Sequence, residues 1–204
     1  MNLNYVANGM GSQSMYLMFL AAQGKIPATI SITADTSDFI ERCQRLASYN
    51  LQEIIIAVDF DGTCAMHEFP YIGADVPGAV DVLKALNAAG AKLILWTMRS
   101  DQAKFKNDPH SLADGTAGKD LDPNFLRHAV QWFEERGIEL WGHNCNEQQA
   151  EWTQSPKCYA HAYIDDAAIG CPLVTDPAIH ARPFVDWNHI CVLLLLRFFD
   201  RGPQ

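Results

Sequence analysis

The sequence predicts an α/β protein with a Rossmann-like, three-layer parallel sheet. Strand-like and helix-like segments alternate along the chain, which is the pattern of repeated β-α-β units. Residues 54–58 and 93–96 are continuous apolar runs, as expected of parallel strands that are buried on both faces. Of the 204 residues, 49% are hydrophobic and 19% are charged, which is typical of a packed globular chain. We therefore expect helices on both faces of one parallel sheet.

The first fifty residues are predicted to form a separate β-α-β annex. Its two strands are expected at residues 3–7 and 28–33, and its helix at residues 14–23. A further helix begins near Ser37 and Asp38, which are both favourable N-cap residues. This helix places Ile40, Cys43 and Leu46 on one face, so we expect these three side chains to point inward.

Residues 51–204 are predicted to form the main domain. Its strands are expected at residues 54–58, 93–96, 138–141 and 159–164. One helix is expected at residues 78–89, a second begins at Asp122, and a third begins at Asp186. The apolar residues of the second helix that should face inward are Leu126, Ala129, Val130 and Phe133. The stretches 64–77 and 100–121 show neither the helical nor the strand periodicity of apolar residues. A connection as long as the second one inside a compact domain is either functional or poorly ordered.

Charge and cysteine content exclude several classes of protein. With 15 Lys and Arg against 24 Asp and Glu, the formal charge of −9 argues against bulk nucleic-acid binding and against docking on anionic lipid. The six cysteines form no Cys-x-x-Cys pair, which favours reduced thiols over a disulfide framework. The apolar run at residues 190–196 is too short for a membrane span. We expect a cytoplasmic protein without a membrane partner.

Acidic and hydroxyl side chains follow three of the predicted strands. Asp59 and Asp61 come after the first strand of the main domain, Thr97 after the next, and Asp165 and Asp166 after the last. Ligands of parallel α/β sheets bind beyond the carboxyl ends of the strands, where these groups should meet. Clustered carboxylates repel one another unless a cation lies among them, and oxygen ligands favour Mg²⁺. The sequence therefore predicts a magnesium site.

The order of these residues resembles the four motifs of the haloacid dehalogenase (HAD) superfamily of phosphohydrolases. The motifs are the Asp-x-Asp-x-Thr of DFDGT at residues 59–63, Thr97, Lys157, and the Asp-Asp of YIDD at residues 163–166. The likeness extends over about residues 53–190, and DFDGT is its most specific part. The stretches LWTMRSD and SPKCYAHAYIDD look most like small, nearly capless members. Receiver domains use a similar set of residues, but their acidic pair comes first in the chain, whereas here it comes last.

The resemblance implies a Mg²⁺-dependent phosphatase that acts on a small-molecule or nucleotide phosphomonoester. Asp59 would attack phosphorus to form an aspartyl-phosphate, and Asp61 would be the general acid and base. Thr97 and Lys157 would bind and neutralise the transferring phosphoryl group. Because an acid stands at Asp61, phosphoryl transfer is favoured over carbon–halogen cleavage.

The resemblance also implies the ligands of the metal and of the substrate. Metal would be held by Asp59, Asp165 and the backbone carbonyl of Asp61, with Asp166 binding through water or supporting the others. Arg99 and Thr63 are expected to contact the substrate phosphate. Lys119 is an alternative to Lys157.

The cap that closes most HAD sites has little room in this chain. The interval from Thr63 to Val80 is too short for a helical cap and fits only a small turn-and-flap element, so the site should be open. Either the substrate is large, or the stretch 100–121 or a partner subunit of a homo-oligomer closes the site.

The N-terminal forty residues resemble the start of PP-loop ATP pyrophosphatases and phosphoadenylylsulfate reductases. Gly-Met-Gly-Ser-Gln-Ser at residues 9–14 precedes a predicted helix, where backbone amides favour phosphate, but the family's Lys and Asp are missing. Two alternatives to the phosphatase therefore stay open. One is a non-catalytic HAD-fold module that binds a nucleotide or a metal, and the other is nucleotide chemistry at the annex.

Overall fold

The computed structural model describes residues 36–101, 122 and 124–198 of the chain. The strands and helix predicted within residues 1–35, and with them the PP-loop-like segment, lie outside the described residues. So does nearly all of the aperiodic stretch 100–121, including Lys119.

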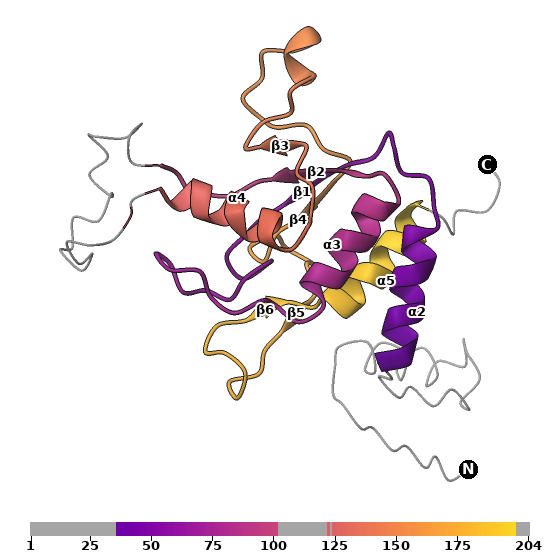
Figure 1. The fold of residues 1–204 in the computed structure, drawn as a ribbon, viewed down its shortest axis with the longest axis vertical. Coiled ribbons are helices and arrows are strands. Elements are labelled where there is room, and N and C mark those ends of the chain that lie inside the picture. The colour runs from indigo at the N-terminus through magenta and orange to yellow at the C-terminus, as the bar shows by residue number, and fades with distance from the viewer. Residues whose placement is uncertain (1–35, 102–121, 123, 199–204) are drawn as a thin grey trace.

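The predicted parallel sheet is confirmed (Figure 1). Its strands are β1 (Ile55–Val58), β2 (Lys92–Leu95), β3 (Gly142–His143) and β4 (Ala162–Ile164). They lie in the order β3-β2-β1-β4, and all neighbouring pairs are parallel. Val58 pairs with Leu95 on one side and with Ile164 on the other. The residues that directly follow these three therefore lie next to one another at the carboxyl edge of the sheet.

One face of the sheet carries the main core. The helices are α2 (Thr36–Ala47), α3 (Ala79–Ala88), α4 (Phe125–Glu135) and α5 (Trp187–Phe198). All of their buried side chains except Phe125 of α4 form one cluster with Ile56, Val58, Leu93 and Leu95 of the central strands. The helix α2 packs on α3 and α5, although the sequence assigns its residues to the annex. Cys43 and Leu46 face this core as predicted, but Ile40 is 54% exposed and Phe39 packs inward in its place.

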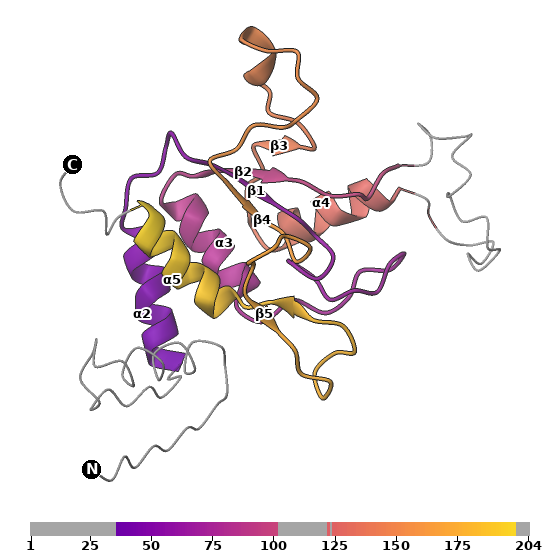
Figure 2. The ribbon, with the colours of Figure 1, turned by 180° about the vertical axis from the view of Figure 1, so that it is seen from behind.

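The reverse face of the sheet is covered by irregular chain. Ile55, Ala57 and Ile94 point to this face and form a second cluster with Cys158 and Ala160. The chain must cross from β3 at one edge to β4 at the other, and a right-handed connection carries it over this face. Between residues 143 and 162 the connection contains one short 3-10 turn, η2 (Gln149–Glu151), visible in Figure 2 at the end of the long excursion. Among the described residues, a loop thus takes the place of the helical layer predicted here.

Two strand predictions differ from the structure in their bounds by more than one residue. The predicted strand 138–141 is wrong, because the chain joins the ladder only where Trp141 N donates to Leu93 O at 2.7 Å, just before β3. The predicted strand 159–164 is shortened to β4. Side chains take the place of ladder partners at Tyr159, whose N–H donates to Gln149 Oε1 and whose carbonyl accepts from Asn146 Nδ2.

A small hairpin after β4 fastens the C-terminal part to the centre of the sheet. Its strands are β5 (Leu173–Val174) and β6 (Phe184–Val185), which are antiparallel. Val185 N donates to Gly62 O at 2.9 Å, and Trp187 Nε1 donates to Thr63 O at 2.6 Å. Asp186 Oδ1 accepts from His189 N at 3.0 Å, which confirms Asp186 as the N-cap of α5. None of the helices in the described part of the chain has the length and apolar character that crossing a bilayer requires.

Candidate functional site

A tight turn follows β1 and presents the first two acids. The carbonyl of Phe60 accepts hydrogen bonds from the N–H groups of residues 63, 64 and 65. Gly62 lies in this turn with φ of +82°, a conformation that glycine adopts without strain. A Cβ atom at this position would lie 2.2 Å from His67 Nε2 and 2.8 Å from Asp166 Oδ2. Both the backbone and the neighbours therefore require glycine here.

Three carboxylates meet at the carboxyl edge of β1 and β4. One oxygen from each of Asp59, Asp165 and Asp166 lies within 4.8 Å of the others, and all three residues are partly buried. The sheet register predicts this meeting, because Asp59 follows Val58 and Asp165 follows Ile164. Three hard oxygen ligands at this spacing suit a divalent cation such as Mg²⁺.

Burial and like charge act together on Asp59. The pKa of Asp59 is raised from 3.8 to about 7, chiefly by desolvation, which a hydrogen bond from the backbone of Phe60 opposes. The negative charges of Asp165, Asp166 and Asp61 contribute to the same rise. An added cation would favour the ionised form of Asp59, so the donor set fits a metal.

The side chains of Thr63 and His67 form hydrogen bonds with the acidic cluster of Asp59, Asp165 and Asp166. Thr63 Oγ1 donates to Asp59 Oδ2 at 3.4 Å and accepts from Asp166 N at 3.2 Å. Thr63 is 0% exposed, so its hydroxyl joins the two acids instead of facing a substrate as the sequence analysis expected. His67 Nε2 lies 2.9 Å from Asp166 Oδ2. His67 was not among the predicted site residues, because a lone histidine in an aperiodic stretch gives no spacing signal.

Arg99 also lies elsewhere than the sequence analysis expected. Its guanidinium forms two hydrogen bonds of 2.7 Å with the two carboxylate oxygens of Asp61. Arg99 is only 2% exposed, so its charge faces Asp61 inside the protein and not an open substrate position. An arginine that follows a strand end can instead turn toward an acid in the turn after the neighbouring strand, as Arg99 turns toward Asp61.

Thr97 lies at the carboxyl edge of the sheet, whereas Lys157 lies on the connection between β3 and β4. Thr97 N donates to Asn144 Oδ1 at 2.8 Å, and Thr97 Oγ1 accepts from Arg99 N at 3.2 Å, so the Thr97 turn lies at the end of β2. Lys157 is exposed, on the connection between β3 and β4. Gln149 Nε2 holds its backbone by donating to Lys157 O at 2.8 Å. The described contacts do not bring the Lys157 ammonium to the acidic cluster.

The predicted small flap is present after the turn. Ala65 bridges Asp75 in antiparallel fashion, and Met66 N donates to Ala74 O at 2.8 Å. The flap is fastened to α4, because Asp75 accepts hydrogen bonds from Trp132 Nε1 and from the Arg136 guanidinium. The edge that carries the acids therefore has a short flap beside it.

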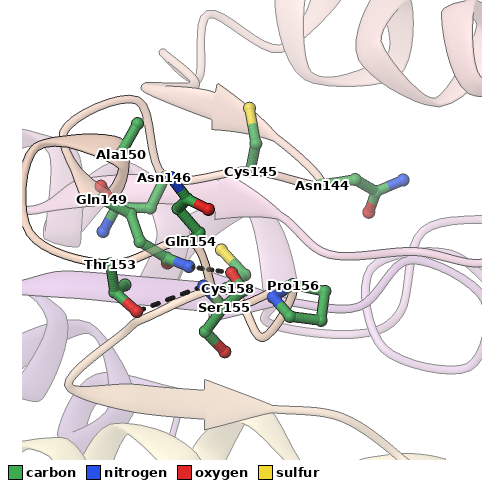
Figure 3. Close-up of a pocket in the computed structure, with 10 residues that line it drawn as sticks. All are labelled: Asn144, Cys145, Asn146, Gln149, Ala150, Thr153, Gln154, Ser155, Pro156 and Cys158. Atoms are coloured by element: carbon green, nitrogen blue, oxygen red, sulfur yellow. Dashed lines mark hydrogen bonds between the residues drawn. The ribbon is translucent and has the colours of Figure 1, made fainter.

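A separate pocket of about 300 Å³ lies in the connection that crosses the reverse face (Figure 3). Its lining residues are Asn144, Cys145, Asn146, Gln149, Ala150, Thr153, Gln154, Ser155, Pro156 and Cys158. Hydrogen bonds within the loop, from Gln149 Nε2 to Ser155 O and from Ser155 N to Thr153 Oγ1, hold its shape. The acidic cluster takes no part in this lining.

Comparison with known proteins gives one informative likeness. No protein-family model matches the chain, and no curated protein is significantly similar to it. A solved structure of a conserved protein from Bacteroides thetaiotaomicron is 31% identical, over 63% of this chain and 86% of that chain, with a TM-score of 0.43. The name of that protein states no activity. At this identity over most of its length, the chain belongs to the same family as that conserved protein.

Proposed function

We propose that the chain is a Mg²⁺-dependent phosphohydrolase that cleaves a phosphomonoester through an aspartyl-phosphate on Asp59. The observation that supports this most strongly is the convergence of Asp59, Asp165 and Asp166 at the carboxyl edge of adjacent strands. Three partly buried carboxylates within 4.8 Å repel one another when they are ionised, and a cation bound among them would relieve that repulsion. The motif order supports the phosphoryl-transfer chemistry.

In the proposed reaction Asp59 forms the bond to phosphorus and Asp61 transfers the protons. A carboxylate oxygen of Asp59 attacks phosphorus while the bond to the leaving oxygen breaks, and Asp61 gives that oxygen a proton. Water then attacks the phosphorus and loses a proton to Asp61, and the bond to Asp59 breaks. Thr97 is the hydroxyl at the adjoining strand end that can donate to a phosphoryl oxygen.

The metal would be held by Asp59, Asp165 and Asp166. When bound, Mg²⁺ supplies charge neutralisation for the phosphoryl oxygens and for the attacking carboxylate. His67 and Thr63 keep the carboxylates of Asp166 and Asp59 in place for it.

A phosphatase panel tests the proposal. Sugar phosphates, nucleotides, an aryl phosphate, and DNA with a 3′- or 5′-phosphate are incubated with Mg²⁺, with EDTA, and with Ca²⁺. We expect turnover of at least one substrate in Mg²⁺, its loss in EDTA, and its recovery when Mg²⁺ is returned. Ca²⁺ should bind without supporting turnover, because it takes more ligands at longer distances.

Matched variants assign the turnover to this site. Asp59→Asn should abolish it, and Asp61→Asn should slow it by about 10²- to 10⁴-fold. Asp81→Asn is the control, because Asp81 is an exposed acid on α3 that does not belong to the group of Asp59, Asp165 and Asp166. Activity that survives in EDTA or in Asp59→Asn would contradict the proposal. Mg²⁺ binding without turnover across the panel would favour the non-catalytic module.

A further inference from the structure

We propose that Arg99 is a positioning residue that fixes the orientation of the Asp61 carboxylate, the ionised form in which Asp61 accepts the proton of the attacking water. This inference rests on the proposed phosphohydrolase function. Arg99 Nε donates to Asp61 Oδ2 and Arg99 Nη2 donates to Asp61 Oδ1, each at 2.7 Å. A guanidinium that binds both oxygens of a carboxylate sets the plane of that carboxylate as well as its position. The Asp61 carboxylate therefore cannot rotate without breaking two charge-assisted hydrogen bonds.

The guanidinium itself is anchored to the flap. Arg99 Nη1 donates to Pro70 O at 3.2 Å, and Arg99 Nη2 also donates to Tyr71 O at 2.7 Å. The side chain is 1% exposed, so these bonds are shielded from water. Arg99 thus joins the flap, through two of its carbonyl groups, to the carboxylate of the acid–base residue.

Aromatic rings hold the guanidinium in its plane. Its central carbon lies 5.0 Å from the ring centre of Phe60 and 5.2 Å from that of Phe69. Phe69 packs in turn against Phe125 of α4, with ring centres 5.2 Å apart. The geometry therefore connects α4, the flap and Asp61 through one buried arginine. A displacement of about 1 Å at a reacting group is enough to lower a rate by about 10²-fold.

The structure offers a matched control for this clamp. Arg136 also binds a carboxylate with two nitrogens, since its Nε and Nη2 donate to Asp75. Asp75 lies on the same flap, but the Arg136 pair does not touch Asp61. Arg99→Lys and Arg136→Lys therefore each replace a bidentate arginine that fastens the flap, and only the first releases Asp61.

The test is steady-state kinetics on the best substrate of the panel, with full-length protein and saturating Mg²⁺. We expect Arg99→Lys to lower kcat by on the order of ten- to a hundredfold and to change KM by about twofold or less. Arg136→Lys should change kcat by about twofold or less. A KM effect of Arg99→Lys with unchanged kcat would overturn the inference in favour of a substrate-binding or flap-holding role.

A double-mutant cycle shows whether Arg99 acts through Asp61. In the Asp61→Asn background, Arg99→Lys should lower kcat by about twofold at most, because the residue that it positions is already gone. Two independent, multiplying effects would overturn the inference. If Arg99→Lys does not fold, the pair Arg99→Met with Asp61→Asn removes both buried charges, and its kcat should equal that of Asp61→Asn alone.

Failure of the proposed function is recognised separately. Wild-type protein without turnover, or Asp59→Asn with full turnover, contradicts the phosphohydrolase itself. Turnover that depends on Asp59, together with a normal kcat in Arg99→Lys, contradicts only the role of Arg99.

Discussion

Asp59 holds its carboxyl group in a setting where the ionised form is unfavourable. Burial raises the pKa of this group to about 7 in the folded protein, against 3.8 for an ordinary Asp. Between about pH 4 and pH 7 the folded state therefore binds a proton that the unfolded chain has released. The contribution of Asp59 to the stability of the metal-free protein therefore falls as pH rises through this window, by about 4 kcal/mol at most.

The first prediction is that Asp59→Asn loses activity but gains stability at high pH. In EDTA at pH 8, Asp59→Asn should melt at a higher temperature than wild type, because it has no carboxylate to ionise there. At pH 4 the difference should shrink, since Asp59 is then protonated in the folded protein. Thermal unfolding followed by circular dichroism at both pH values measures this. Asp81→Asn is the control, and equal pH dependence in wild type and Asp59→Asn would refute the prediction.

The second prediction concerns Gly62. Gly62→Ala places a methyl group against His67 and Asp166 and also strains a backbone at φ of +82°. Gly170→Ala is the matched control, because Gly170 has φ of +89° and no atom lies within 4 Å of the position that a Cβ atom would take there. We expect Gly62→Ala to cost roughly 1–3 kcal/mol more than the control in urea unfolding, since only Gly62 adds a clash. An equal loss of unfolding free energy in the two variants would show that His67 and Asp166 move aside without cost and would contradict the prediction.

The residues that the sequence analysis placed correctly are those fixed by strand ends. Asp59 and Asp165 meet because each directly follows a buried strand residue, and parallel register brings these positions together. Arg99 and Thr63 were misplaced, because their partners come from other turns and no local pattern shows which way a side chain turns.

At the scale of elements, strands with continuous apolar runs were predictable and the connection from β3 to β4 was not. Residues 144–161 follow no helical period, and side-chain hydrogen bonds shape the loop in place of a ladder. Gln149 is the centre of this arrangement. It is 8% exposed and binds Tyr159 N, Ser155 O and Lys157 O.

The third prediction is that Gln149→Ala loosens this connection. Its loss leaves the N–H of Tyr159 without its acceptor, at a cost of about 1–3 kcal/mol. Hydrogen exchange of residues 150–160 should become faster, while exchange in β1 should change little. Gln148→Ala is the control, because the exposed Gln148 takes part through its backbone N–H, which donates to Asn146 Oδ1. Unchanged exchange in Gln149→Ala would disprove the central role of Gln149.

At the scale of the whole molecule, the parallel α/β class followed from the alternation of elements, but the distribution of helices over the two faces did not. Both β1-α3-β2 and β2-α4-β3 advance in the same direction along the sheet, so right-handed crossovers place α3 and α4 on the same face. The return from β3 to β4 runs the opposite way and must use the other face. Strand order decides this, and strand order was not part of the sequence pattern.

The fourth prediction concerns the bond that joins the end of the described chain to its centre. Trp187→Phe removes the donor to Thr63 O and should cost roughly 1–3 kcal/mol in urea unfolding. It should also lower phosphatase activity, because Thr63 supports Asp59 and Asp166. Trp152→Phe, at a position that is 62% exposed, is the control. Equal stability of the two variants would contradict this role of the indole N–H.

The two hydrogen bonds from Val185 and Trp187 to the turn after β1 have a consequence for biosynthesis. Gly62 and Thr63 leave the ribosome more than a hundred residues before Val185 and Trp187, whose N–H groups satisfy their carbonyls. A nascent chain can pair β1 with β2 early, yet it lacks the donors to Gly62 O and Thr63 O in the turn after β1 until α5 begins to emerge. Chains that end before Val185 should therefore lack both of these hydrogen bonds to the turn that carries Asp61 and Thr63.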